Sequence, residues 1–229
     1  MQTLTTPPEN PILAKSAVKT VRLDDLTGPI QHVRPVRRDM KLEKLLLWRK
    51  ESAEVAVQPL THDMEVYGYT KGQFSMLDLL KAVLKKTGPA AMDFSTWTAN
   101  RKEALELAAM KQRGELTAIR WLVDMTFVRR DPEAAAAIRQ DFGAEAIRVA
   151  HCHAKFALFY NDSWRLVLRT SMNLNMNPRT EDYHLAHDPD LFDFIHGIMD
   201  RIWKLQHRTL SDAKPGVISQ AFKQETLQP

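Results

Sequence analysis

The residues best suited to chemistry lie in two short segments, each beside a predicted strand. Histidine, cysteine and lysine crowd together in His151-Cys152-His153-Ala154-Lys155, at the entrance to an apolar run. Side chains of a strand alternate between its two faces, so His153 and Lys155 point one way and Cys152 points the other. We therefore expect an imidazole and an ammonium group on one face and a buried structural thiol on the opposite face.

The second segment, residues 170–175, supplies a hydroxyl and a carboxamide. Ser171 and Asn173 share a strand face by the same alternation. Two apolar runs flank Asp162-Ser163, a pattern typical of a β-hairpin. Such a hairpin brings the second segment back beside the first, so the sequence predicts one cluster made from both segments.

This cluster has the chemistry to act on a phosphodiester. The imidazole of His153 is a nucleophile near neutral pH. The ammonium of Lys155 and the carboxamide of Asn173 can hold phosphate oxygens, and the Ser171 hydroxyl can donate to the same group. None of the four is a hard metal ligand of the carboxylate type.

The pattern His153-x-Lys155 followed by Ser171-x-Asn173 resembles the HxK…[GS]SxN signature of the phospholipase D superfamily. The resemblance implies that His153 is the nucleophile and forms a phosphohistidine intermediate. It implies that Lys155 and Asn173 bind phosphate oxygens and that Ser171 supports them. It also implies that Glu181, downstream of the second motif, orients the nucleophilic histidine and favours the imidazolium.

The chain departs from that family's pattern at two positions. Tyr160 stands where the family has aspartate, and Thr170 replaces the common glycine before Ser171. Asp162 is interpreted as a turn residue and not as a displaced equivalent of the aspartate. Because of Tyr160, a second hypothesis stays open: a catalytically decayed phospholipase D-like protein with a nucleic-acid-binding or structural role.

The signature occurs once in the sequence. Of the eight histidines, only His153 is followed by lysine two residues later. In the family that the chain resembles, one histidine attacks phosphorus while another protonates the leaving oxygen, which are complementary duties. The resemblance therefore implies a two-fold homodimer with its site across the interface, working without a metal or another cofactor.

A metal site is the alternative interpretation of the histidines. It would combine His151 and His153 with His184, His187 and Asp188. His184 and His187 cannot share a strand face at a spacing of three, and His187 precedes a predicted helix. We therefore expect no metal in this protein.

Hydrophobic periodicity predicts an α/β fold, a mixed β-sheet flanked by helices on both faces. From residue 63 onward, short apolar runs alternate with capped amphipathic segments. After residue 145, three apolar runs follow with no room for helices between them, so the sheet must be mixed. The predicted strands are residues 64–69, 90–96, 118–125, 146–150, 155–161, 165–169 and 182–186, and helices are predicted after Ser75, Asn100, Asp131 and Asp188.

Proline distribution predicts the domain organisation, because six of the twelve prolines fall within the first 59 residues. We expect a flexible arm and basic extension over residues 1–59, the phospholipase D-like catalytic domain over 60–208 and a tail over 209–229. The extension is expected to contain one short helix, over residues 40–52.

Residues 31–50 carry seven lysines and arginines against two acidic residues, in a chain of net charge +4. This stretch favours a polyanionic partner, and we expect nucleic acid, DNA or RNA. A solvated helix face is the plain alternative, and the leucines and Trp48 of the expected helix leave open contact with a membrane surface and a phospholipid phosphodiesterase. The expected nucleic-acid contacts are Arg34, Arg37, Arg38, Lys41 and a base-stacking Trp97.

Composition excludes several classes of protein. A single cysteine, Cys152, excludes an intramolecular disulfide and any Cys-rich zinc or iron–sulfur site. The eight glycines form neither GxGxxG nor GxxxxGK[ST], so dinucleotide and P-loop chemistry are disfavoured. With no apolar run near the roughly 18 residues of a membrane span and no signal peptide at the N-terminus, we expect a cytoplasmic protein without stable membrane insertion.

Overall fold

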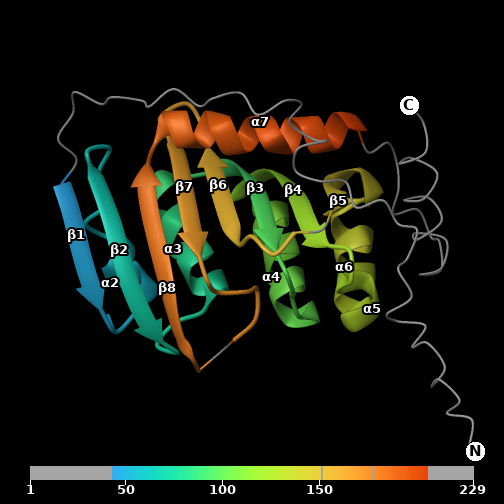
Figure 1. Cartoon of the computed structure of the whole chain (residues 1–229), viewed down its shortest axis with the longest axis horizontal. Coiled ribbons are helices and arrows are strands. Elements are labelled where there is room, and N and C mark those ends of the chain that lie inside the picture. The colour runs from blue at the N-terminus through green and yellow to red at the C-terminus, as the bar shows by residue number, and fades with distance from the viewer. Residues whose placement is uncertain (1–42, 151, 177, 206–229) are drawn as a thin grey trace, which may run out of the picture.

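An eight-stranded sheet organises the part of the chain that the computed structural model describes, residues 43–150, 152–176 and 178–205. Its order is β1-β2-β8-β7-β6-β3-β4-β5 (Figure 1). The strands are β1 Glu43–Trp48, β2 Met64–Lys71, β3 Ala90–Thr96, β4 Leu116–Asp124, β5 Ile147–Ala150, β6 Phe156–Tyr160, β7 Arg165–Thr170 and β8 Thr180–His187. The helices are α2 Ala53–Val57, α3 Met76–Thr87, α4 Arg101–Gln112, α5 Phe127–Arg130, α6 Pro132–Phe142 and α7 Pro189–Leu205, with a 3₁₀ turn at Ala144–Ala146.

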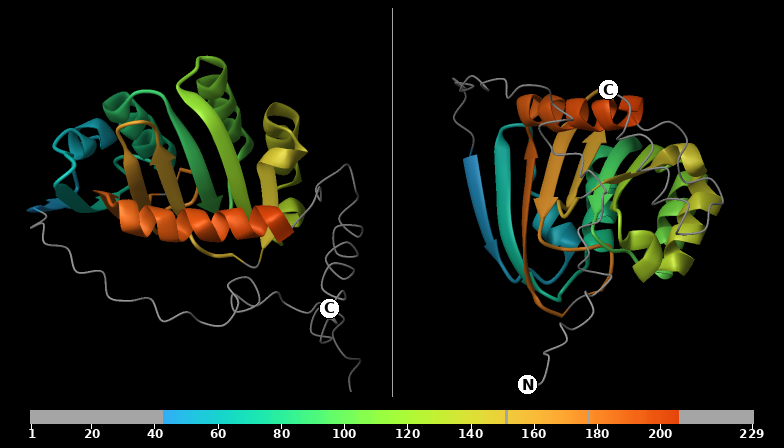
Figure 2. Two further views of the ribbon diagram at one scale, coloured as in Figure 1. Left: turned by 90° about the horizontal axis from the view of Figure 1, so that it is seen from above. Right: turned by 45° about the vertical axis from the view of Figure 1, so that its right-hand side comes forward.

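Helices cover both faces of this mixed sheet, which confirms the predicted fold class. Helix α7 runs across the strands on one face, called the front face below, and α2, α3, α4 and α6 lie behind the sheet (Figures 1 and 2). The larger core lies on the back face, and a smaller apolar cluster lies under α7. None of the described helices combines the length and apolar character needed to cross a bilayer.

Local signals in the sequence begin the helices as predicted. Ser75 and Asp78 form a reciprocal capping box at the start of α3. The side-chain oxygen of Asn100 accepts the Glu103 amide N–H at 3.0 Å and begins α4. The Asp188 carboxylate likewise accepts an amide N–H in the first turn of α7.

One helix start is built differently from the prediction. Asp131 precedes Pro132 at the start of α6, but its side chain makes no capping hydrogen bond. It accepts a hydrogen bond from the Thr98 hydroxyl at 2.5 Å instead. Asp131 therefore ties α6 to the loop that follows β3.

The helix predicted over residues 40–52 is wrong, because Glu43–Trp48 form strand β1. This strand pairs in parallel with β2 at the edge of the sheet. Leu47 is buried whereas Leu46 and Trp48 are exposed, which is the period-2 pattern of a strand. Residues 43–57, expected in the basic extension, thus belong to the sheet and its core, while residues 40–42 lie outside the described residues.

Strands β6 and β7 form the predicted hairpin. Phe156 pairs with Arg169 at its open end, and Tyr160 pairs with Arg165 beside the turn. The turn is stabilised by Asn161, whose side-chain oxygen accepts two amide N–H groups, at 3.0 and 2.9 Å. The hairpin therefore returns the chain to the end of the sheet where β6 begins.

A buried charge network joins two strands to α7. Asp93 of β3 has no exposed surface and accepts two hydrogen bonds from the Arg120 guanidinium of β4, at 2.6 and 2.5 Å. Arg120 also donates to Asp200 of α7 at 2.6 Å. His196 of α7 places Nδ1 2.7 Å from the Asp93 carboxylate. Helix α7 is thus held to the front face by charge as well as by apolar packing.

We predict opposite effects for two glycine-to-alanine substitutions. A Cβ atom on Gly68 of β2 would lie 2.1 Å from the buried ring of Tyr183 on β8, so Gly68→Ala should lower the free energy of unfolding by about 1–3 kcal/mol. Gly197 of α7 has open space around its Cα, so Gly197→Ala should raise that free energy by about 1 kcal/mol. Urea denaturation measures both, and effects of the same sign would contradict this account.

Candidate active site

The residues predicted to carry the chemistry gather at one end of the sheet, where β3 and β7 end and β6 and β8 begin. His153 and Lys155 directly precede β6, and Ser171 and Asn173 directly follow β7. Glu181 is the second residue of β8. Neighbouring antiparallel strands thus place these side chains at the same end of the sheet.

His153 and Lys155 are in direct contact, with Lys155 Nζ 3.0 Å from His153 Nδ1. An ammonium group can only donate, so Nδ1 accepts while Lys155 is charged, and a neutral imidazole then carries its proton on Nε2. Burial lowers the pKa of Lys155 below its ordinary value, and the nearby Glu181 carboxylate opposes this shift. The proton position on His153 is therefore coupled to the charge of Lys155.

Ser171 and Glu181 form a second contact within the site. The Ser171 hydroxyl donates to the Glu181 carboxylate, and Ser171 Oγ accepts the Asp182 amide N–H at 3.0 Å. The Glu181 charge also acts on Lys155, so the carboxylate interacts with a residue of each motif. Its predicted role in orienting His153 stays a prediction.

Asn173 lies in a loop that is fixed to the loop after β3. The backbone of its neighbour Leu174 accepts from the Asn100 amide and donates to the Thr98 carbonyl, both at 3.1 Å. The Asn173 side-chain oxygen is buried and has no hydrogen-bond partner among the described residues. The two ends of an amide interchange by rotation, so this buried position can present an N–H to a phosphate oxygen.

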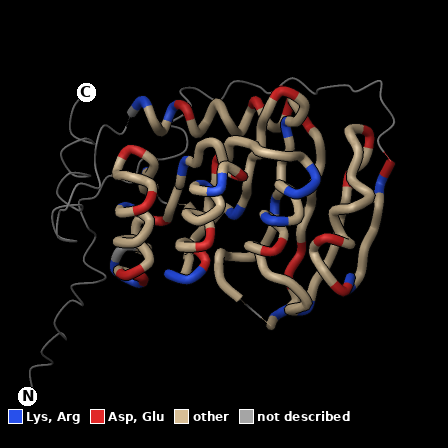
Figure 3. Tube along the Cα trace, turned by 180° about the vertical axis from the view of Figure 1, so that it is seen from behind, with Lys and Arg blue, Asp and Glu red and all other residues tan. Residues whose placement is uncertain are grey.

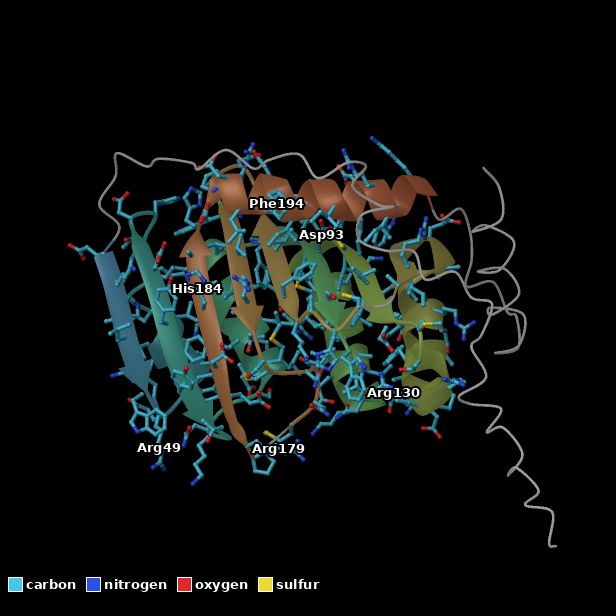
Figure 4. All side chains as sticks on the ribbon, in the orientation of Figure 1. Arg49, Asp93, Arg130, Arg179, His184 and Phe194 are labelled. Atoms are coloured by element: carbon cyan, nitrogen blue, oxygen red, sulfur yellow. The ribbon has the colours of Figure 1, made fainter. Side chains whose placement is uncertain are left out.

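Trp97 lies beside the predicted nucleophile. Its ring centroid is 5.3 Å from that of His153. Arg130 of α5 covers the same indole, with its guanidinium carbon 3.6 Å from the ring centroid, and donates to the Trp97 carbonyl at 2.5 Å. Figure 4 shows Arg130 at the edge that carries the site.

Arg130 is the residue here that the sequence did not reveal. Arg130 directly precedes Asp131-Pro132, which predict the start of a helix. Its partner Trp97 is 33 residues away in the sequence. The sequence does show that Arg130 follows the strand that ends at Asp124. This position is an indication of a site residue, because binding sites in α/β proteins open at the carboxyl ends of strands.

Tyr160 lies at the end of β6 that is remote from Lys155. Its ring packs against Phe192 and His196 of α7, with centroid distances of 5.4 and 5.3 Å. Burial raises the pKa of its hydroxyl. The departure from the family pattern at this position therefore concerns packing under α7, not the His153 cluster.

The remaining predicted residues lie outside this cluster or outside the described residues. Arg34, Arg37, Arg38 and Lys41 belong to the undescribed segment 1–42, so their contacts with nucleic acid stay predictions. Cys152 is half-buried, not buried as expected, and packs against the apolar cluster under α7 with its sulfur 3.4 Å from the Ser95 hydroxyl.

The described residues contain no group of three or more histidine, cysteine or carboxylate side chains that could hold a metal ion. His184 stacks on Tyr67 on the front face, with a centroid distance of 4.2 Å. His187 lies against the rings of Trp164 and His62. Each of these histidines is thus part of an aromatic contact within the fold.

Neither a protein-family model nor a curated protein matches the sequence. Among solved structures, the chain is similar to a phospholipase D family member, Nuc from Salmonella typhimurium, with 17% identity and a TM-score of 0.43 over 60% of this chain and 92% of that chain. It is also similar to polyphosphate kinase from Porphyromonas gingivalis, with 12% identity and a TM-score of 0.45 over 66% of this chain and 27% of that chain.

A phospholipase D family member is thus among the structures that this chain resembles. The likeness concerns the fold alone.

We predict that Lys155 titrates below the ordinary lysine value of about 10.4, because burial disfavours its ammonium form. Glu181→Gln should lower this pKa further, because it removes a negative charge that favours the ammonium. The pKa is measured from the ¹³Cε chemical shift of Lys155, assigned by its loss in Lys155→Arg. A pKa at or above the ordinary value, or a rise in Glu181→Gln, would contradict the described site.

Proposed function

We propose that the protein is a metal-independent phosphodiesterase, a nuclease that cleaves DNA or RNA through a phosphohistidine at a site shared by two copies of the chain. The observation that carries the proposal is the contact between His153 and Lys155 at the edge that also holds Ser171, Glu181 and Asn173. These groups would supply a nucleophile, a cation and hydrogen-bond donors to a bound phosphate.

The proposed first step begins when a phosphate draws the Lys155 ammonium onto its oxygens. This frees Nδ1 of His153 to carry the ring proton and leaves the lone pair of Nε2 to attack phosphorus. The N–P bond forms as the bond to the leaving oxygen breaks, and the leaving oxygen takes a proton from a second imidazole. Water then attacks the phosphohistidine, the N–P bond breaks, and the second imidazole accepts the proton of the water.

A second copy of the chain supplies the second imidazole in this proposal. The described part of one chain holds one histidine–lysine contact of this kind. The acid role belongs to the imidazolium form of the second histidine, which becomes neutral when it protonates the leaving oxygen and is regenerated when it takes the proton of water, so two identical clusters can share the two duties. The functional unit is then a two-fold dimer with the scissile phosphate between the clusters.

Nucleic acid is the proposed substrate because an aromatic ring and a cation adjoin the nucleophile. A base next to the scissile phosphate can stack on Trp97, and the Arg130 guanidinium supplies positive charge beside it. The hypothesis of a decayed binding protein rested on Tyr160, which packs under α7 away from these residues. This position gives the cleavage hypothesis the stronger support.

We predict that His153→Ala lowers cleavage of labelled single- and double-stranded DNA and RNA roughly 10³-fold or more, in excess chelator, while binding is retained. His62→Ala is the matched control, because His62 is exposed and stacks on Trp164 far from the cluster. Cleavage by His153→Ala at the rate of the native chain would sink the proposal. Absence of cleavage by the native chain at every pH between about 5 and 8 would favour the binding protein.

A mixing experiment tests the shared site. Excess His153→Ala chain added to native chain should reduce activity well beyond dilution, because mixed dimers lose one of the two imidazoles. The same excess of His62→Ala chain should leave activity unchanged. A fully active monomer in the ultracentrifuge would contradict the shared site.

A further inference from the structure

No described helix covers the front face of the three strands at one edge of the sheet, β1, β2 and β8. Helix α7 crosses the same face over the strands from β7 toward β4, and β1, β2 and β8 lie beyond its beginning (Figures 1 and 2). Leu46 and Trp48 of β1 are 76% and 62% exposed, and Tyr69 of β2 is 51% exposed. Large apolar side chains so open to water mark a surface that receives a partner.

Aromatic rings follow one another across these strands. Trp48 and Tyr69 lie side by side, with ring centroids 6.1 Å apart. Tyr67, two residues before Tyr69 on the same face of β2, stacks on His184 of β8 with an interplanar angle of 11°. Trp48, Tyr67, Tyr69 and His184 are called the aromatic platform below, and Figure 4 marks His184 within it.

Cationic side chains surround the aromatic platform. Lys44 places its ammonium 6.0 Å from the centroid of the Tyr67 ring, and Arg169 of β7 pairs with His184. Arg49 follows β1 with a left-handed backbone, φ 49°, and its amide bonds to the Tyr69 carbonyl. Of the carboxylates on this face, Glu65 accepts a hydrogen bond from the Tyr67 hydroxyl and Asp182 is exposed.

The aromatic platform and the candidate active site share strands β7 and β8. Strand β7 runs from Arg169 beside the platform to Ser171 at the site, and β8 runs from Glu181 at the site to His184. Arg49, Arg179 and Arg130 lie along the edge that carries the site (Figure 4). Glu181 lies on the face of β8 opposite His184, so a polyanion resting on the platform would reach the site around this end of the sheet, without crossing α7.

We propose that single-stranded nucleic acid binds on this face, with bases stacked on Trp48 and Tyr69 and phosphates near Lys44, Arg49 and Arg169. Stacking accepts any base, because every base has a π-face, and exposed rings on an open sheet suit unpaired bases. Bases within a duplex are already stacked on one another, so the platform selects single strands.

A second copy of this chain fits the edge at β1 less well than single-stranded nucleic acid does. Strand β1 is four strand spacings from β6, which carries His153 at its start. Two copies joined along β1 would hold their histidines about 40 Å apart, at about 4.8 Å per spacing. A dimer joined along β1 could not form the shared site, so the proposed function does not require a second copy at this edge of the sheet.

The test compares binding of a fluorescent oligothymidylate by full-length variants. Trp48→Ala and Tyr69→Ala should each weaken binding about tenfold, from the loss of one stacked base, and Trp48→Phe should retain most of the affinity. Affinity for a duplex of the same length should change less than twofold. Phe194→Ala is the matched control, because Phe194 is a 53% exposed aromatic on α7, away from the platform.

Three results would overturn the platform. One is unchanged oligothymidylate affinity in the double variant Trp48→Ala/Tyr69→Ala, with its fold verified by circular dichroism. A second is conversion of a native dimer into monomers by that variant in the ultracentrifuge, which would assign the face to self-association. A third is Trp48-dependent binding to anionic lipid vesicles with no binding of oligothymidylate.

The inference rests on the proposed function for its substrate, yet the two can fail separately. Cleavage of bis(p-nitrophenyl) phosphate should require His153 and should not change in Trp48→Ala, because this small ester cannot contact His153 and Trp48 at the same time. If that cleavage is seen while oligothymidylate binding ignores Trp48, the platform is wrong and the phosphodiesterase stands. If oligothymidylate binding requires Trp48 while no substrate is cleaved, the platform stands and the phosphodiesterase is wrong.

Discussion

A buried carboxylate determines where α7 lies and thereby which parts of the sheet meet water. Asp93 has no exposed surface, so its charge must be compensated inside the protein. Arg120 supplies the paired hydrogen bonds from β4, and His196 and Asp200 complete the network from α7. The network therefore fixes α7 to β3 and β4, and the helix also packs against β7. Among the described helices, none lies over the aromatic platform on β1, β2 and β8 (Figure 1).

The candidate site depends on a different constraint, the register of the β6–β7 hairpin. Phe156 pairs with Arg169, so the residues just before β6 and just after β7 leave the sheet at one end. The loop after β7 is fixed further by the backbone of Leu174, which bonds to the loop after β3. Three chain segments that are distant in sequence thus position His153, Lys155 and Ser171. None of these three residues lies within a strand or helix.

Local signals made most of the fold predictable, and long-range contacts account for the failures. Ser75 and Asn100 begin helices through hydrogen bonds within three residues, and a short apolar run between two capped helices predicts β3. Strand β1 was mistaken for a helix because its leucines and lysine favour helices locally, whereas its strand form depends on pairing with β2. In the site, the HxK and SxN spacing revealed both motifs, but the contact of Arg130 with Trp97 joins two loops and leaves no local pattern.

The order of the strands leaves one helix to cover an entire face. Strands β1 to β5 run in the same direction and advance across the sheet in one sense, so right-handed crossovers place all the connecting helices on the same side. Among residues 43–205, the opposite face of the sheet is covered by the 17 residues of α7 (Figure 1). At about 1.5 Å per residue they reach about 25 Å, whereas eight strands about 4.8 Å apart span about 34 Å. Within the described part of the chain, exposure at the β1 edge is therefore a matter of length, because one helix of about 25 Å cannot cross all eight strands.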